Sequence, residues 1–143
     1  MLLKVLSDLS LHDMKLFRDA ADKFIAEYVR KTYSKIEVKS GRYMLNHKCH
    51  LNAVNYAVEK KESNIVLCVT LFNDEPNIHF INFTKYKYVD NTLGQWSATY
   101  DYYFVRFVDE NKYYSIVDVF SKYRAELNRC LPWYLRLFGE YKF

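Results

Sequence analysis

Ile65-Val66-Leu67-Cys68-Val69-Thr70-Leu71-Phe72 is a continuous run of apolar and β-branched residues with polar turn residues on both sides. This pattern is typical of a strand that is covered on both faces, because a half-exposed strand would alternate apolar and polar positions. We therefore expect residues 65–72 to form a central strand of a sheet.

Two further apolar segments follow this strand after the polar turn at 73–77. Residues 78–83 and 86–89 are separated only by Thr84-Lys85, which predicts a β-hairpin. A third segment, residues 102–108, has the same strand character. The sequence thus predicts a small antiparallel sheet.

Three segments have the three- and four-residue apolar spacing of helices. The first begins at Ser10, a good N-cap residue, and runs to about residue 31. The second has Asn46 as its predicted N-cap and ends at residues 60–64. The third begins at Ile116 and is limited by Pro132. Residues 34–41 read as a polar connector with a possible short extended piece. We expect one α+β domain over residues 1–143, with N-terminal helices on the sheet and a C-terminal helix.

Composition narrows the classes of function. The chain has 143 residues, half of them apolar, and a net charge of +4 that is spread along the sequence, which is not the pattern of a nucleic-acid-binding protein. The apolar start at 1–6 is too short for a signal peptide or a membrane span, so we expect a cytoplasmic protein. Three cysteines without a Cys-x-x-Cys pair argue against a disulfide framework or a thiolate zinc site, and we expect no metal and no cofactor.

One cysteine lies where a helix could activate it. Cys49 would sit about three residues inside the second predicted helix, where unpaired backbone N–H groups and the helix dipole favour a thiolate. An ordinary free thiol has a pKa near 8.5, so a neighbouring imidazolium would be needed as well. Cys68 and Cys130 lie in apolar patterns and are most simply core thiols.

The predicted hairpin brings a histidine and an aspartate together. Counting outward from a turn centred between residues 84 and 85 places His79 opposite Asp90. Directly opposed residues have Cβ atoms about 4.5–5.5 Å apart, which lets a carboxylate accept an imidazole N–H and fix the tautomer of the ring. Each residue alone is more often structural, but the three in this order and setting favour a catalytic interpretation.

The sequence here resembles the papain-like and transglutaminase-like cysteine superfamily. The resemblance covers roughly residues 43–94, and these segments carry it: Cys49-His50-Leu51-Asn52-Ala53, Ile78-His79-Phe80 and Tyr88-Val89-Asp90-Asn91-Thr92. It implies a papain-like core in which Cys49 is the nucleophile, His79 the general base and acid, and Asp90 the group that orients the histidine. No Gln precedes Cys49, so Tyr43 and Asn46 are the candidate oxyanion donors beside the Cys49 backbone N–H.

Two other features near these segments are open to more than one interpretation. Trp96, after the turn residue Gly94, could form the rim of a cleft or simply pack. His47 and His50 flank Cys49, but the three residues lack the geometry of a closed zinc site.

The sequence therefore predicts a small cysteine hydrolase or acyltransferase, in the class of peptidases, amidases, deamidases and transamidases, with a protein, peptide or other amide substrate. The alternative is a catalytically inactive papain-like binding module, an inhibitor or adaptor, that uses its Tyr-rich surface and apolar tail. A nucleic-acid binder ranks third, because the basic residues form no motif.

Overall fold

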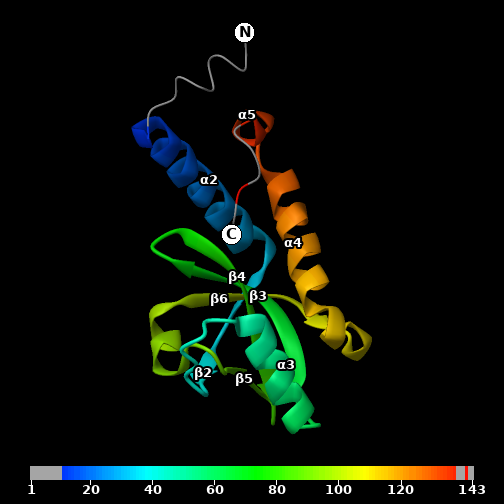
Figure 1. The fold of residues 1–143 in the computed structure, drawn as a ribbon. Helices are drawn as coiled ribbons and strands as arrows, with labels where there is room; N and C mark the ends of the chain where they lie inside the picture. Colours follow the sequence, from blue (N-terminus) through cyan, green and yellow to red (C-terminus); the bar gives the residue numbers. More distant parts are fainter. Residues whose placement is uncertain (1–10, 138–140, 142–143) are drawn as a thin grey trace.

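The computed structural model describes residues 11–137 and 141 and has an α+β fold (Figure 1). A long helix comes first, a curled sheet with one short helix forms the middle, and two helices follow. The elements are α2 (Leu11–Thr32), β1 (Ser34–Ile36), β2 (Val38–Ser40), α3 (Cys49–Glu59), β3 (Asn64–Phe72), β4 (Glu75–Thr84), β5 (Lys87–Asp90), η1 (Gly94–Thr99), β6 (Asp101–Val108), η2 (Glu110–Ser115), α4 (Ile116–Cys130) and α5 (Trp133–Arg136).

The six strands form one sheet in the order β1-β6-β3-β4-β5-β2. The two edge strands, β1 and β2, are consecutive in the chain and separated only by Glu37. Because one residue joins the two edges, the sheet must curl until they approach each other. The predicted connector over residues 34–41 is thus the segment that brings the edges together. The prediction of an antiparallel sheet is wrong at one edge, since β2 pairs with β5 in parallel.

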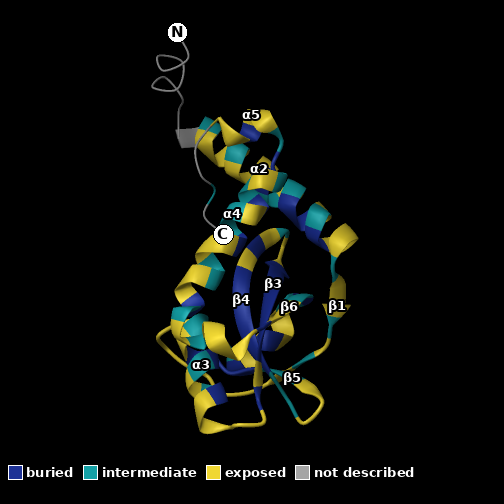
Figure 2. Ribbon diagram, turned by 90° about the vertical axis from the view of Figure 1, so that its right-hand side faces the viewer, coloured by how far each residue is buried: buried dark blue, intermediate teal, exposed yellow. Residues whose placement is uncertain are grey.

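The central strand is β3, as its apolar run predicts, and residues 65–71 are all buried. Its alternate side chains enter two different cores. Ile65, Leu67 and Val69 pack with α2, α3 and α4 on the outer face, whereas Val66 and Cys68 lie inside the curl with Ile81 and Tyr102. Figure 2 shows α3 and α4 on one side of β3 and β4, and the edge strand β1 of the curled sheet on the other side. Both faces of the strand are therefore covered.

The hairpin between β4 and β5 turns one residue later than predicted. Lys85 and Tyr86 have φ values of 49° and 61°, the left-handed pair of a two-residue type I′ turn, and Thr84 pairs with Lys87. The sequence carries no Asn-Gly or Asp-Gly signal at this turn, so the turn residues do not reveal its position.

The second helix also begins later than predicted. His47 has a φ of 52°, which ends any helical path before Lys48, and α3 starts at Cys49 with Lys48 as its N-cap. Asn46 is not the N-cap residue, and Cys49 is the first residue of the helix rather than the third. The C-terminal helix α4 begins at Ile116, as predicted, and the predicted cap Ser10 lies outside the described residues.

None of the helices described in residues 11–137 is long and apolar enough to span a bilayer.

Candidate active site

Cys49 is held at the first turn of α3 by the loop that precedes it. The backbone N–H of Lys48 donates to the Asn46 side-chain oxygen at 3.0 Å, and the Asn46 and Asn52 amides bond to each other at 2.9 and 3.1 Å. These contacts tie the loop to the helix on both sides of the cysteine. The Cys49 side chain is partly buried against the outer core.

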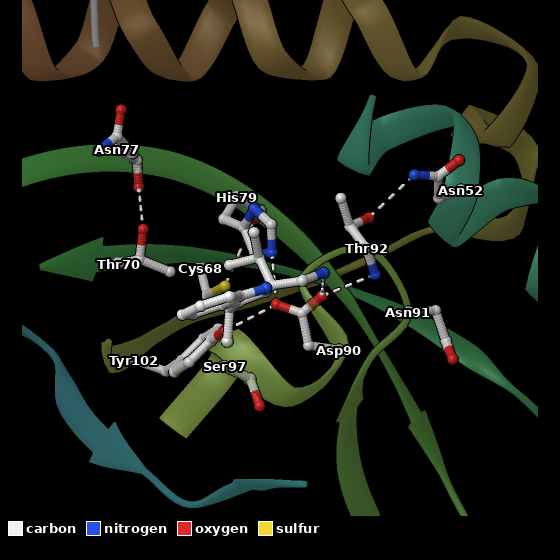
Figure 3. A network of polar contacts seen from close by, with 12 residues as sticks. Asn52, Cys68, Thr70, Asn77, His79, Asp90, Asn91, Thr92, Ser97 and Tyr102 are labelled. Atoms are coloured by element: carbon white, nitrogen blue, oxygen red, sulfur yellow. Dashed lines mark hydrogen bonds and ion pairs between the residues drawn. The ribbon is translucent and has the colours of Figure 1, made fainter. Parts of the chain in front are cut away.

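His79 and Asp90 meet inside the curl, although not in the register that the sequence suggested. β4 and β5 pair Asn82 with Val89, so continuing the ladder places Asp90 opposite Ile81. His79 is the diagonal neighbour on the same face, and diagonal pairs are still within reach of long side chains. His79 Nε2 lies 2.7 Å from Asp90 Oδ2 (Figure 3). The prediction that the two residues are directly opposed is therefore wrong, because the turn lies one residue later.

The end of the β4–β5 ladder leaves a backbone donor facing Cys49. The pairing of these two strands extends no further than Asn82 and Val89. Residues two apart in a strand direct their backbone groups to the same side, so the Phe80 N–H points to the edge where β5 has ended. The Cys49 sulfur accepts a hydrogen bond from this N–H group.

The surroundings of Cys49 favour its thiolate. Burial disfavours the charged form, but the charge of His79, hydrogen bonds from the His50 and His79 side chains and the Phe80 N–H outweigh it and lower the pKa of Cys49 to about 6. Since His79 Nε2 is taken by Asp90, Nδ1 is the ring nitrogen that remains for the sulfur.

The imidazole is stabilised in its charged form by the groups on either side. Burial of His79, which is 7 % exposed, disfavours the imidazolium. The Cys49 thiolate and the hydrogen bond to Asp90 outweigh this effect and raise the pKa of His79 to about 10. The two opposite shifts describe a thiolate–imidazolium pair.

Asp90 is fully buried and its carboxylate has four hydrogen-bond donors. Oδ2 accepts from His79 Nε2 at 2.7 Å and from the Tyr102 hydroxyl at 2.6 Å, while Oδ1 accepts from the backbone N–H groups of Thr92 and Leu93 at 2.8 Å each. Burial alone would raise the pKa of Asp90, but His79, Tyr102 and the backbone donors lower it to about 2. A carboxylate so saturated stays ionised and keeps one orientation.

Three buried amides that have no role in the sequence-based prediction fix α3 on the sheet. Asn82, which is fully buried, donates to the Ala53 carbonyl at 3.0 Å and accepts from the Asn91 amide at 2.9 Å. Asn52 donates to Thr92 Oγ1 at 3.1 Å. The contacts connect the helix that carries the thiol with the strand ends that carry His79 and Asp90. The sequence carries a signal for Asn82 alone, a polar residue between Ile81 and Phe83 in an apolar strand segment.

The loop before Cys49 is also joined to the turn after Asp90. Gly41 N–H donates to the Asp90 carbonyl at 2.9 Å, and Met44 N–H donates to the Thr92 carbonyl at 2.9 Å. A Cβ at Gly41 would lie 2.6 Å from the Asp90 carbonyl oxygen. Only glycine permits this close approach, so Gly41 is a residue of the site that the sequence analysis treated as part of a connector.

The other predicted site residues lie around this centre rather than in it. Tyr43 forms a bridge with Leu93 and is 48 % exposed, and Trp96 in η1 is 53 % exposed, so Trp96 is not a core residue. The Asn46 amide is engaged with Asn52. Of the other thiols, Cys68 is buried as predicted, whereas Cys130 is only partly buried.

Within the part of the chain that the structure describes, no group of three or more His, Cys, Asp or Glu side chains is arranged to hold a metal ion. Comparisons of the chain with protein-family models, with curated proteins and with solved structures give no match.

Proposed function

We propose that this chain is a cysteine hydrolase or acyltransferase in which Cys49 is the nucleophile, His79 its proton acceptor and donor, and Asp90 the group that orients His79. The observation that carries the proposal is the position of a thiol at the first residue of α3, beside an imidazole that lowers its pKa and whose Nε2 lies 2.7 Å from a buried carboxylate. This combination makes an activated nucleophile.

The pKa values of Cys49 and His79 determine how the pair is protonated before a substrate binds. With the pKa of Cys49 near 6 and that of His79 near 10, the proton of the pair resides on the imidazole at neutral pH. The nucleophile is then present before a substrate arrives. His79 can deliver its Nδ1 proton directly to a leaving group.

The reaction follows from these positions. The Cys49 thiolate attacks the carbonyl carbon of an amide or ester, and the carbonyl electron pair moves to oxygen. Collapse of this intermediate breaks the bond to the leaving group, which takes the proton from His79, and leaves a thioester on Cys49. Neutral His79 then takes a proton from water or an amine, which attacks the thioester carbon. The carbon–sulfur bond breaks, the acid or amide product leaves, and the Cys49 thiolate and the His79 imidazolium are restored.

A backbone donor for the oxyanion lies beside the sulfur. The N–H groups of the first helical turn have no intrahelical acceptor, and Cys49 is the first residue of α3. We propose that its N–H group binds the developing oxyanion. Asn46 is less suited as the second donor because its amide is bonded to Asn52, and Tyr43 remains the side-chain candidate.

The arrangement supports a papain-like or transglutaminase-like organisation of the core. The resemblance to these proteins implies a cysteine at a helix start, with a histidine and an aspartate or asparagine on adjacent strands. Here α3 packs against β4, and β4 and β5 supply the other two residues. A peptide or another amide is the substrate class that this chemistry suits.

The first test is the reactivity of Cys49 as a function of pH. Iodoacetamide labelling followed by peptide mapping resolves the three cysteines in one experiment. We expect the rate at Cys49 to reach half its maximum near pH 6, because only the thiolate reacts. A Cys49 that reacts at pH 6 to 7 no faster than in the unfolded chain contradicts the proposal.

The second test is formation of the thioester. Incubation with p-nitrophenyl acetate should release p-nitrophenol and add one acetyl group to the peptide that contains Cys49. The matched control is Cys130→Ala, which removes a thiol that is also partly exposed but lies outside the site. An acetyl group found on Cys130 and absent from Cys49 would exclude Cys49 as the nucleophile.

A non-catalytic binding module is the second candidate, and one observation favours it. Tyr43, Leu45 and Trp96 expose large apolar side chains near the site, with Leu45 79 % exposed. Such a surface suits a protein partner as well as a substrate. A binding module has no need of an activated thiol, so an ordinary Cys49 titration would favour this alternative.

A further inference from the structure

Tyr102 is a buried polar residue of the site to which the reaction assigns no proton or bond. It lies in β6, is 2 % exposed, and donates its hydroxyl hydrogen to Asp90 Oδ2 at 2.6 Å. Its ring also meets the His79 ring edge-on, with centroids 6.0 Å apart. Figure 3 shows the hydroxyl directed at the same carboxylate that faces His79.

The hydrogen bond crosses the interior of the curl. In the sheet order, β6 is separated from β5 by β3 and β4, so Tyr102 and Asp90 are not neighbours along a ladder. Both side chains must point into the enclosed face to meet, and Tyr102 packs there with Val66, Cys68 and Ile81. Tyr102 therefore connects the strand that carries Asp90 to a strand on the far side of the sheet.

The other contacts of the Asp90 carboxylate cannot provide this connection. Its Oδ1 donors, the N–H groups of Thr92 and Leu93, belong to the turn that begins with Asp90 itself and would move with it. β5 pairs with β4 through Lys87, Tyr88 and Val89 and with β2 along its other edge, where Ser40 lies opposite Asp90, but these ladders hold the backbone of Asp90 and not its carboxylate. The donors on Oδ2 are the ones that come from other strands.

We propose that Tyr102 is a positioning residue that holds the Asp90 carboxylate against His79 and so keeps His79 facing Cys49. The inference rests on the proposed function, because its effect is the thiolate–imidazolium pair. Without the hydroxyl, the carboxylate can turn from His79, the imidazolium loses part of its stabilisation, and the thiol regains its proton at neutral pH.

The test is the titration of Cys49 in Tyr102→Phe, which removes only the hydroxyl. We expect the midpoint of the labelling profile to rise by about one pH unit, which at pH 6 lowers the alkylation rate about fivefold. Tyr123→Phe is the matched control, since Tyr123 is 1 % exposed and its hydroxyl bonds to that of Tyr33 in the outer core. It should lose stability without moving the midpoint.

Each result decides between defined alternatives. A midpoint near 6 that Tyr102→Phe leaves unchanged, with a lower melting temperature, shows a merely structural hydroxyl and overturns the proposal. A midpoint that falls shows that Tyr102 competes with His79 for Oδ2 and also overturns it. A wild-type midpoint in the ordinary thiol range contradicts the proposed function itself, so the two failures are distinguishable.

A measurement on the wild-type protein covers the case in which Tyr102→Phe does not fold. The Tyr102 hydroxyl proton should give an NMR signal that is protected from solvent exchange and shows a contact with the His79 ring. A hydroxyl proton that exchanges as fast as that of an exposed tyrosine would overturn the proposal.

Discussion

Cys49 and Cys68 lie on either side of the same histidine, and their pKa values shift in opposite directions. Cys49 meets the His79 ring and the Phe80 N–H, and its pKa falls to about 6. Cys68, one strand away, donates its S–H to the His79 backbone carbonyl at 3.4 Å, and burial raises the pKa of its thiol well above the ordinary range. One thiol faces donors, and the other faces an acceptor.

The difference shows that closeness to a histidine does not activate a thiol by itself. Cys68 is fully buried inside the curl, where the negative charges of Asp90 and Cys49 also oppose its ionisation. Cys49 is placed at a helix start and at the end of a strand ladder, where backbone donors are free. The low pKa of Cys49 therefore comes first from the charge of His79 and from the His50 and His79 side chains, and the Phe80 N–H adds to them.

The largest effect should come from replacing the Cys49 thiol by a hydroxyl. Cys49→Ser is expected to reduce acyl transfer from p-nitrophenyl acetate by at least about 1,000-fold, because a hydroxyl in this site is not ionised. Steady-state release of p-nitrophenol measures it, with circular dichroism to confirm folding. Residual activity within tenfold of wild type would show that another group is the nucleophile.

The second prediction tests whether His79 causes the difference in pKa between Cys49 and Cys68. In His79→Gln, the pKa of Cys49 should return toward the range of an ordinary thiol. At pH 6.5 its alkylation rate should fall by about two orders of magnitude. The control is His47→Gln, which changes an exposed histidine in the loop before the helix. If His79→Gln leaves the profile at a midpoint near 6, His50 and the helix start would account for the low pKa instead.

Asp90 acts on the two thiols with opposite sign. Its charge raises the pKa of Cys68 directly, and through His79 it favours the thiolate of Cys49. Because the pKa of Asp90 is lowered from 3.8 to about 2, its ionisation stabilises the folded state above about pH 4, and this contribution is lost as the pH falls through 2. The shift corresponds to about 2 kcal/mol.

Urea unfolding of wild type and Asp90→Asn between pH 2 and 6 measures this contribution. The free energy of unfolding of the wild type should fall by about 2 kcal/mol more than that of Asp90→Asn on acidification below pH 4. Parallel curves for the two proteins would mean that Asp90 is not held as a carboxylate by its four donors.

Strand β3 and the start of helix α4 could be predicted from the sequence, but the start of α3 and the hairpin register could not. The run at 65–72 predicted β3 because alternation was absent, and the spacing from Ile116 predicted α4. Helix periodicity and β-branched residues are local signals, so these elements could be found without tertiary information.

The start of α3 and the register of the β4–β5 hairpin depend on single backbone conformations. The left-handed residues His47, Lys85 and Tyr86 set the start of α3 and the hairpin register, and none of them is a glycine or an asparagine that would reveal the turn. The roles of Gly41 and Tyr102 follow from contacts across the curl, between segments about 50 residues apart for Gly41 and three strands apart for Tyr102. No local pattern encodes such contacts.

Cys68→Ala should have the smallest effect, and it tests directly whether Cys68 influences the pKa of Cys49. The substitution removes a fully buried sulfur and is expected to lower the free energy of unfolding by about 1 kcal/mol, measured by urea titration. The labelling midpoint of Cys49 should remain near pH 6, because Cys68 contacts the backbone of His79 and not its ring. A midpoint that moves by more than about half a pH unit would show that the position of His79 depends on packing inside the curl, and the two thiols would then have to be treated as one coupled unit.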